Sequence, residues 1–471
     1  MIIGAGMGLC APLGWAMGDP PSSLYALLVA GGLTMAVGLG MRIAVRRVVA
    51  ELTRRDGFVV VALGWLSVSA FGALPYLLSG VIRTPAAALF ESVSGFTTTG
   101  ASVLSDLEHL PRGILFWRSL THFFGGMGVL VLCVAVLPLL GTGGMQIFRA
   151  EVTGPLKNRL TPRIASTAKL LWSLYVGLIS VEAVLLRLGG LSWFDAWCHS
   201  VATVATGGFS TRTDSLAAFP SPFVQIVVTF FMLISGVNFS LHYLWLRGAW
   251  GAHVRSSEFR VFLSTWALVC LAAVLWVSFA HGLAEGMGRT AREVVFQVTS
   301  LMTTTGFVIT DYDRWPNGLR LTLMLLVAVG GCAGSTSGGM KMVRIVVALK
   351  VVFREIRRAV LPSSVMQIKV DGEPVADDLL AGIVAVVLMY ITIAMVAGAA
   401  MTAFTPNIET AISSVITTLS GCGPGLGAVG PMLTYAGIPA AGQLILCACM
   451  LLGRLEFFTL LVLFLPRFWR R

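Results

Sequence analysis

The sequence predicts an all-α polytopic membrane protein in which four membrane-pore-membrane repeats surround a central pore, preceded by two N-terminal helices. The 471-residue chain is 56% hydrophobic and only 12% charged, whereas soluble domains carry about 25% charged residues. A turn rich in threonine and glycine also recurs four times, at intervals of about 100 residues, which indicates an internally repeated architecture. The four turns end at Gly100, Gly208, Gly306 and Gly423.

Each turn follows a short apolar segment and precedes a long one. The short segments hold about 12 residues, or about 18 Å of helix. Because the hydrocarbon core is about 30 Å thick, we expect them to be re-entrant. Two further spans, at 1–17 and 24–43, come first, and no basic region of a signal peptide precedes them. In the order span, re-entrant segment and span, the repeats are expected at 57–80, 85–96 and 114–140; 167–189, 194–205 and 221–247; 259–281, 291–304 and 320–350; and 377–402, 407–419 and 437–465.

These segments give ten full spans and five structural units. The expected boundaries are 1–50 for the two-helix domain and 51–145, 146–250, 251–355 and 356–471 for pore repeats 1 to 4.

The distribution of positive charge predicts the orientation. Most of the 33 Lys and Arg residues lie in the connections between repeats, which the positive-inside rule places in the cytoplasm. The turns then open to the outside. This bias explains the net charge of +11, and without a recognisable nucleic-acid module we expect membrane lipid, not nucleic acid, as the surroundings. The acidic residues after the turns either concentrate cations at an outer mouth or are ordinary loop charges; they are Asp106, Glu108, Asp214, Asp311 and Asp313.

The four turns are the candidate cation site. Irregular backbone at membrane depth is tolerated only where protein buries it or where it lines a cavity, and rings of carbonyl oxygens can replace the hydration shell of K⁺. Each re-entrant helix also ends at its turn, so its negative dipole end points toward a bound cation. The alternative, packing glycines and helix caps, does not account for four turns at matching places. The expected filter residues are Thr98, Thr99, Gly100, Thr206, Gly207, Gly208, Thr304, Thr305, Gly306, Gly421, Cys422 and Gly423.

A second irregular feature interrupts the last span of the third repeat. Five glycines in the ten residues 330–339 should not hold a regular helix. A broken helix near the midplane marks a functional element in transporters, although glycines can also serve helix packing. On the cytoplasmic side of the third turn, this segment could obstruct the pore. The expected gate residues are Gly330, Gly331, Gly334, Ser335, Thr336, Gly338 and Gly339, with Arg454.

Arg454 joins this set because it lies within the last span, where a charge is costly and usually faces a cavity or a partner. One interpretation places it beneath the filter, where it could touch the broken helix. The other pairs it with Glu456 or lets it reach the cytoplasmic surface.

The chain resembles the TrkH-type membrane subunit of bacterial Trk potassium uptake systems, within the Trk/Ktr/HKT superfamily, over nearly its whole length. The motifs that carry the resemblance are Ser94 to Ala101, Cys198 to Ser200, Ala205 to Thr211, Thr303 to Phe307, Gly330 to Gly339 and Gly421 to Gly425, with the linker segments Met145 to Val152 and Leu160 to Ala165.

The resemblance implies one filter glycine in each repeat, and Gly100 in the first repeat favours K⁺ over Na⁺. It implies that the loop near Gly334 gates the pore and that Arg454 corresponds to the family's arginine in the last span. It also implies a homodimer in the bacterial inner membrane and a cytosolic nucleotide-binding regulatory subunit. Where relatives often have asparagine and an aliphatic residue, the fourth turn here has Ser420, Gly421 and Cys422.

We therefore expect a potassium-selective uptake pore with a carbonyl-lined filter and an intramembrane gate. A K⁺:H⁺ or K⁺:Na⁺ symporter with alternating access is the alternative. An enzyme is not expected, since the six His residues form no catalytic motif and no carboxylates are paired within a span. The eight Cys residues show no metal-binding spacing, so no cofactor is expected and K⁺ is the transported ion.

Overall fold

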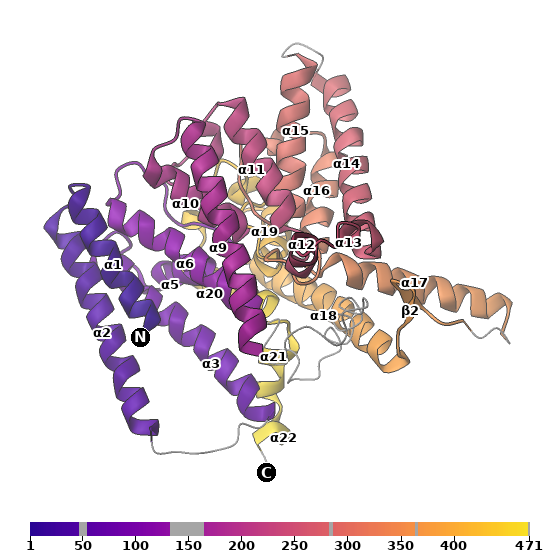
Figure 1. The fold of residues 1–471 in the computed structure, drawn as a ribbon, viewed down its shortest axis with the longest axis horizontal. Coiled ribbons are helices and arrows are strands. Elements are labelled where there is room, and N and C mark those ends of the chain that lie inside the picture. The colour runs from indigo at the N-terminus through magenta and orange to yellow at the C-terminus, as the bar shows by residue number, and fades with distance from the viewer. Residues whose placement is uncertain (47–53, 132–163, 282–285, 363–365, 470–471) are drawn as a thin grey trace.

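The computed structural model describes residues 1–46, 54–131, 164–281, 286–362 and 366–469, and these are almost entirely helical (Figure 1). Their short strands β1 (Lys369–Val370) and β2 (Glu373–Pro374) form one antiparallel pair, with Lys369 opposite Pro374. The predicted all-α class is confirmed. The linker motif at 145–152, most of that at 160–165 and the end of the span predicted at 114–140 lie outside the described residues.

An N-terminal hairpin of two helices, α1 (Ile2–Ala16) and α2 (Pro21–Val45), precedes the repeats. The two helices approach closely at glycines: a methyl group on Gly4 would lie 2.6 Å from the carbonyl oxygen of Gly31. Small residues permit such contact between membrane helices, where dispersion rather than hydrophobic burial drives association. The hairpin packs on the first repeat through α6.

The four short helices form where the sequence analysis expects re-entrant segments. They are α5 (Pro85–Phe96), α10 (Trp193–Val204), α15 (Met287–Met302) and α19 (Ile408–Ser420). Local sequence explains where they begin. Proline occupies the start of α5, while the side chains of Ser192 and Asn407 accept hydrogen bonds from the first backbone N–H groups of α10 and α19.

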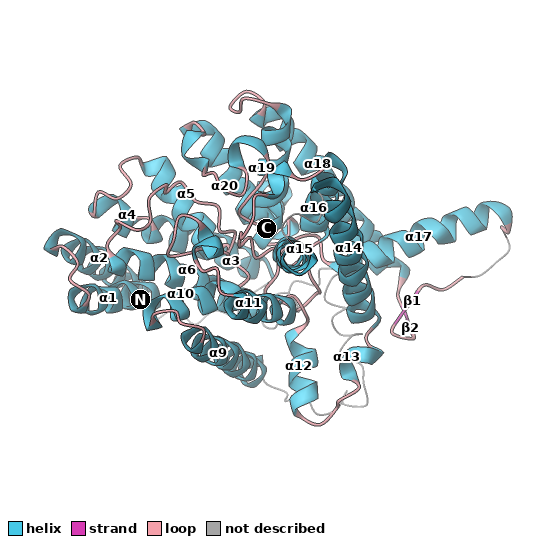
Figure 2. Cartoon of the chain, turned by 90° about the horizontal axis from the view of Figure 1, so that it is seen from above, coloured by secondary structure: helices cyan, strands magenta, loops and turns pink. Residues whose placement is uncertain are grey.

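These helices form a closed ring with the second helices of the repeats. Each short helix contacts the following helix of its own repeat and that of the preceding repeat, in the order α5, α6, α10, α11, α15, α16, α19, α20 and back to α5. Figure 2 shows this order around the centre of the molecule. The predicted arrangement of four repeats around one axis is therefore confirmed. The ring's longer helices are α6 (Arg112–Val131), α11 (Pro222–Ser235), α16 (Asn317–Val329) and α20 (Ala440–Arg454).

Outside the ring, the first helix of each repeat packs against its own short helix. These outer helices are α3 (Arg54–Gly72), α9 (Ile164–Leu188), α14 (Ser257–His281) and α18 (Asp377–Met401). The remaining elements are α4 (Leu74–Leu78), η2 (Ser215–Ala218), α12 (Phe239–Leu246), α13 (Ala252–Arg255), η3 (Tyr312–Arg314), α17 (Met342–Val360), η4 (Gly427–Val429), η5 (Tyr435–Gly437), α21 (Phe458–Leu461), η6 (Val462–Phe464) and α22 (Pro466–Trp469).

The ten expected spans are not uniform. Among the described residues, five helices are long and apolar enough to cross a membrane, and two further spans are bent pairs. The span predicted at 221–247 bends by 99° between α11 and α12, and that at 437–465 by 110° after α20. Neither of these two predicted spans is therefore a single continuous helix. The predicted break in the third repeat is confirmed, since α16 ends at Val329 and α17 begins at Met342. α1 is a shorter apolar helix.

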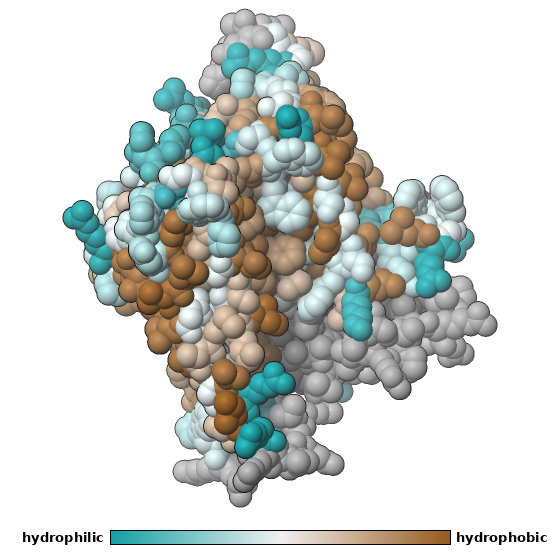
Figure 3. Space-filling model, turned by 60° about the vertical axis from the view of Figure 1, so that its left-hand side comes forward, coloured by the Kyte–Doolittle hydropathy of each residue, from teal (hydrophilic) through white to brown (hydrophobic). Residues whose placement is uncertain are grey.

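The outer surface suits a lipid environment. Large apolar side chains on the outward faces of the peripheral helices are exposed, among them Leu28 and Leu33 of α2, Leu271 of α14 and Met395 of α18. Figure 3 shows hydrophobic side chains over the middle of one face and hydrophilic ones toward its ends. Such a band is what a multi-pass membrane protein presents to hydrocarbon.

Candidate ion-binding site

All four turns bring the backbone to the left-handed region at the same position. The residue two places before each turn's last glycine has positive φ: 53° at Thr98, 51° at Thr206, 55° at Thr304 and 68° at Gly421. Non-glycine residues rarely adopt this conformation, and where they do the strain clusters at functional sites. The repetition indicates that the turn's shape, rather than its residue type, is shared.

The last glycines of the turns are less alike. Gly100, Gly208 and Gly306 have φ of 79°, 76° and 82°. Gly423 does not have a positive φ. In the fourth turn only Gly421 takes the left-handed conformation. All four turns therefore end in glycine, but the four glycines do not share one backbone conformation.

Contacts between neighbouring turns explain why a glycine is needed at all four places. A methyl group on Gly100 would lie 1.9 Å from the carbonyl oxygen of Gly207, and one on Gly208 would lie 2.1 Å from that of Thr305. A methyl group on Gly306 would meet the backbone nitrogen of Gly423 at 3.1 Å, and one on Gly423 would return to the carbonyl of Gly100 at 2.7 Å. Each turn therefore touches the next, and the fourth closes the ring on the first.

Several hydroxyls of the turns already have partners within the protein. Thr99 pairs with Thr97 at 2.8 Å and Thr305 with Thr303 at 2.8 Å, while the Thr206 hydroxyl donates to the carbonyl of Ala205. The hydroxyl of Thr98 is buried and has no partner among the described residues. Hydroxyls that brace the turns leave the backbone carbonyls as the more uniform set of oxygens.

The second turn lacks the third threonine because an aromatic ring occupies its space. A methyl group on Gly207 would lie 2.5 Å from Nδ1 of His122, which extends from α6 of the first repeat. The imidazole stacks on Phe209, with ring centroids 4.2 Å apart. Glycine at 207 is therefore a consequence of packing between repeats.

In the fourth turn, tyrosines support the backbone. The hydroxyl of Tyr435 donates to the carbonyl of Gly423 at 2.8 Å, and that of Tyr312 donates to the carbonyl of Gly425 at 3.0 Å. Cys422 is fully buried. Sequence reasoning missed both tyrosines, which lie in the short helices η3 and η5, 113 and 12 residues along the chain from the glycines that they contact.

Sequence reasoning also missed a buried ion pair behind the first two turns. The Nε atom of Arg118 lies 2.8 Å from a carboxylate oxygen of Glu91, and the two side chains are 2% and 0% exposed. The available signal was Glu91 itself, a carboxylate within a predicted re-entrant segment.

The acidic residues after the turns mostly bind protein groups. Asp106 contacts His109 at 2.9 Å, Asp311 contacts Arg314 at 2.9 Å, and Asp313 contacts Arg320. The hydrogen bond from His109 lowers the pKa of Asp106, and the same contact raises the pKa of His109. These pairs favour the interpretation of ordinary loop charges over that of a cation-concentrating mouth.

The glycine-rich segment 330–341 forms a loop against the ends of the short helices. Backbone N–H groups of Gly339 and Gly338 donate to the carbonyl of Ser420 at 2.8 Å and to the hydroxyl of Thr304 at 2.7 Å. The hydroxyl of Thr336 donates to the carbonyl of Val204 at 2.8 Å. The loop thus satisfies last-turn carbonyls of α10 and α19, which no helix hydrogen bond can reach.

The other predicted gate residues shape this loop or hold it together. Gly330, Gly334 and Gly339 have φ of 74°, 72° and 76°, which favours glycine. The backbone N–H of Gly331 donates to the hydroxyl of Ser337, and the hydroxyl of Ser335 donates to the carbonyl of Cys332.

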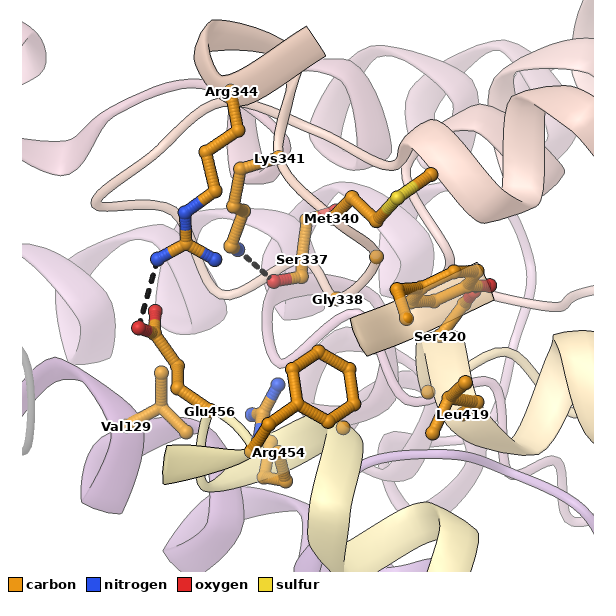
Figure 4. A pocket seen from close by; sticks show the side chains of 15 residues that line it. Val129, Ser337, Gly338, Met340, Lys341, Arg344, Leu419, Ser420, Arg454 and Glu456 are labelled. Carbon is orange, nitrogen blue, oxygen red and sulfur yellow. Dashed lines mark hydrogen bonds and ion pairs between the residues drawn. The ribbon is translucent and has the colours of Figure 1, made fainter. Parts of the chain in front are cut away.

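Arg454 touches the loop, as one of the two interpretations expects. Its Nη1 donates to the carbonyl of Thr336 at 3.0 Å. Glu456, in the bend after α20, pairs with Arg344 of α17 at 2.7 Å. Figure 4 shows this pair, and the contact of Lys341 with Ser337, around one pocket.

This pocket is small. Its volume of about 40 Å³ is enough to hold water. Its lining joins the loop (Ser337 to Lys341) to the end of α19 (Leu419 to Gly421) and to Gly453 and Arg454. The pocket therefore lies between the loop, the end of the fourth short helix and the end of α20.

The fold and the ring together define an all-helical, multi-pass membrane protein built from four pore-type repeats. The chain belongs to the TrkH family: the family model described as TrkH, cation transport protein, matches residues 26–471. The family's members are transport proteins, which confirms the expectation that the chain is not an enzyme.

Named relatives cover nearly the whole chain. The Trk system potassium uptake protein TrkH of Halomonas elongata is 40% identical over 451 residues, covering 95% of this chain and 92% of that protein. The protein of the same name from Salmonella typhimurium is 43% identical over 431 residues, covering 90% of this chain and 88% of that protein. The crystal structure of the potassium transporter TrkH from Vibrio parahaemolyticus matches with a TM-score of 0.86 and 35% identity, covering 100% of this chain and 98% of that one.

Proposed function

We propose that this chain is the potassium-selective, ion-translocating subunit of a Trk-type uptake system in a bacterial inner membrane. The observation that carries the proposal is the closed ring of four turns, in which each last glycine touches the backbone of the next turn. The names of the relatives supply the ion, since they are potassium uptake proteins. Proteins of this kind move the ion without chemical conversion, and K⁺ is the transported ligand rather than a cofactor.

In this proposal K⁺ sheds water at the turns and binds their backbone carbonyls, with the residues 98–100, 206–208, 304–306 and 421–423 as the filter. Two features support carbonyls over hydroxyls. The hydroxyls of Thr99 and Thr305 are engaged with neighbouring threonines. The second and fourth turns have no threonine at the corresponding position, where Gly207 and Cys422 stand. The C-terminal ends of four helices add a favourable negative potential at the same place.

The loop 330–341 is the proposed gate, closed in this arrangement. Its donors occupy the helix-end carbonyls of Ser420 and Val204, which would otherwise face a passing cation. Arg454 holds the loop through Thr336 and adds a positive charge next to the path. Opening then requires the loop to leave these partners.

The proposed organisation has the five units 1–50, 51–145, 146–250, 251–355 and 356–471, assembled as a homodimer. A cytosolic nucleotide-binding subunit would regulate the loop. The family resemblance carries both assembly proposals, and the relatives' name, Trk system, is that of a system with more than one component. A cross-linking and mass measurement in native membranes tests the dimer.

Flux through purified protein in liposomes tests the proposed activity. With a potential set by ionophore, K⁺ should enter passively and follow the potential, whereas Na⁺ should enter at least about tenfold more slowly. Uptake that depends strictly on a proton or sodium gradient would instead support the symporter. Protein that passes no K⁺ under any gradient would contradict both.

The substitution Gly100→Ser tests the filter assignment. The serine Cβ would lie 1.9 Å from the carbonyl oxygen of Gly207, so the first and second turns must separate. A wider ring holds its carbonyls less suitably for K⁺, and we expect the K⁺/Na⁺ permeability ratio to fall by about tenfold. An unchanged ratio in folded Gly100→Ser protein would remove the first turn from the filter.

A further inference from the structure

The strongest feature that the proposed function does not use is the buried pair of Glu91 and Arg118. Glu91 lies on α5, six residues before the first turn, and Arg118 lies on α6. Burial of two charges is costly unless further hydrogen bonds satisfy them. Here Glu91 accepts from the hydroxyl of Ser102 at 3.0 Å and from the backbone N–H of Val103 at 3.0 Å. Its carboxylate therefore holds the chain just after the first turn.

Arg118 reaches the second turn at the same time. Its Nη1 donates to the carbonyl of Ser210 at 3.0 Å, and its Nη2 donates to the hydroxyl of Ser102 at 3.2 Å. The guanidinium also lies over the ring of Phe209, 4.0 Å from its centroid. Ser102 and Ser210 each stand two residues after the last glycine of their turn. One side chain thus fixes corresponding points of two neighbouring walls.

The same helix position supports the outgoing chain in two other repeats, but without charge. Six residues before the second turn, Nε2 of His199 contacts the hydroxyl of Ser210 at 3.0 Å. Six residues before the third, Gln297 donates to the carbonyl of Phe307 at 3.3 Å. The first repeat differs because its brace carries a charge and reaches across to the next repeat.

We propose that Arg118 and Glu91 are positioning residues that set the spacing of the first two turns and thereby the ion preference of the filter. The fork of the guanidinium suits this geometry, because it donates to three acceptors, on Glu91, Ser102 and Ser210, that belong to two neighbouring repeats. Its partner carboxylate neutralises the arginine, so that the brace places no net positive charge beside a cation path. This inference rests on the proposed function, since it assumes that the ring selects K⁺.

The variant Arg118→Lys tests the geometry without changing the charge. A single ammonium group cannot hold Glu91, Ser102 and Ser210 in the same arrangement. We expect the K⁺/Na⁺ permeability ratio to fall about tenfold while maximal K⁺ flux stays within about threefold, because Arg118 contacts the chain after the turns, so that its loss displaces the walls by less than a methyl group inside the ring does. Arg314→Gln is the matched control: Arg314 also pairs with a carboxylate on the same side but is 84% exposed, and its loss should leave the ratio unchanged.

A second variant keeps the test valid if Arg118→Lys does not fold. Ser102→Ala removes one hydroxyl that accepts from Arg118 and donates to Glu91, without removing a charge. We expect a shift of the permeability ratio in the same direction, of about threefold. Folded variants with wild-type ratios but lower thermal stability would overturn the proposal and leave only a structural role. Wild-type protein that conducts K⁺ and Na⁺ equally would instead refute the proposed function.

Discussion

The ring of turns and the loop next to it are both irregular backbone within a helical membrane protein, but their backbone is supported in opposite ways. Four chain segments of similar conformation build the ring, and each touches its neighbour directly through backbone atoms. The loop belongs to the third repeat alone, and it forms hydrogen bonds with residues of other repeats, such as Val204, Ser420 and Arg454. Repetition gives a rigid frame, whereas the single segment has attachments that can be released one by one.

The strength of these attachments decides which part can move. Each neutral hydrogen bond of the loop contributes about 1 kcal/mol net, and the one from Arg454 about 1.5–3 kcal/mol. Release of the loop therefore costs a few kcal/mol, which is the size of free energy that allosteric coupling between two sites typically provides. The ring offers no comparable route, because separating one turn disturbs both of its neighbours.

The largest expected effect comes from adding a methyl group to the ring. In Gly208→Ala the new atom would lie 2.1 Å from the carbonyl oxygen of Thr305, at a φ of 76° that alanine disfavours. We expect K⁺ flux in liposomes to fall about a hundredfold, because an ångström of displacement at a precise site has effects of that order. Gly64→Ala is the control, since no atom lies within 4 Å of that position. Normal flux in Gly208→Ala would mean that ions do not pass the ring.

The same chemical change in the loop should act with the opposite sign. In Gly338→Ala the methyl group would lie 1.8 Å from the carbonyl oxygen of Ser420, which pushes the loop away from the end of α19. Gly338 is not among the left-handed residues, so the effect is steric. We expect K⁺ flux without any regulatory subunit to rise about tenfold, as the loss of about 1.4 kcal/mol from the closed state requires. A fall in flux would show that the loop supports the path instead of closing it.

Arg454→Ala tests the contribution of charge to closure by the loop 330–341, whereas Gly338→Ala tests the contribution of steric fit. The substitution removes the hydrogen bond to the carbonyl of Thr336 and a buried positive charge. Leak of K⁺ through the unstimulated protein should rise by about tenfold. Arg454→Lys retains the charge and should leak less than Arg454→Ala. Equal flux in wild type and Arg454→Ala, in the presence and absence of regulators, would exclude a role for Arg454 in closure.

Much of this architecture was predictable because its signals, the repeated turns and the length of the apolar segments, can be read from short stretches of sequence. The short helices, their ends and the break near Gly334 follow from apolar length and glycine content. The bends after α11 and α20 were missed for different reasons. Asn238, whose side chain caps α12, was an available signal. Before the bend near Glu456 the only local signal was Gly453, at the end of α20, and Glu456 itself has a φ of 55° and pairs with Arg344.

The supports of the ring were less accessible to sequence reasoning. Residue type and spacing identify the turns themselves. Arg118 and Tyr435, however, contact segments more than ten residues away in the chain, and no sequence pattern predicts such contacts. The four glycines also differ in structure, since Gly423 has a different backbone conformation from the other three. The differences in conformation and support among the four turns can be recognised only when the residues that contact each turn are known.

The smallest expected effect tests that inequality directly. Tyr435→Phe removes the hydroxyl that donates to the carbonyl of Gly423 and leaves the ring in place. A neutral hydrogen bond contributes about 0.5–1.5 kcal/mol, and a loss near the lower end of that range corresponds to about a threefold fall in the K⁺/Na⁺ permeability ratio, which we expect with little change in K⁺ flux. Tyr25→Phe on the exposed surface of α2 is the control. If Tyr435→Phe matches wild type while Ser102→Ala does not, the fourth wall contributes less to selectivity than the braced first and second walls.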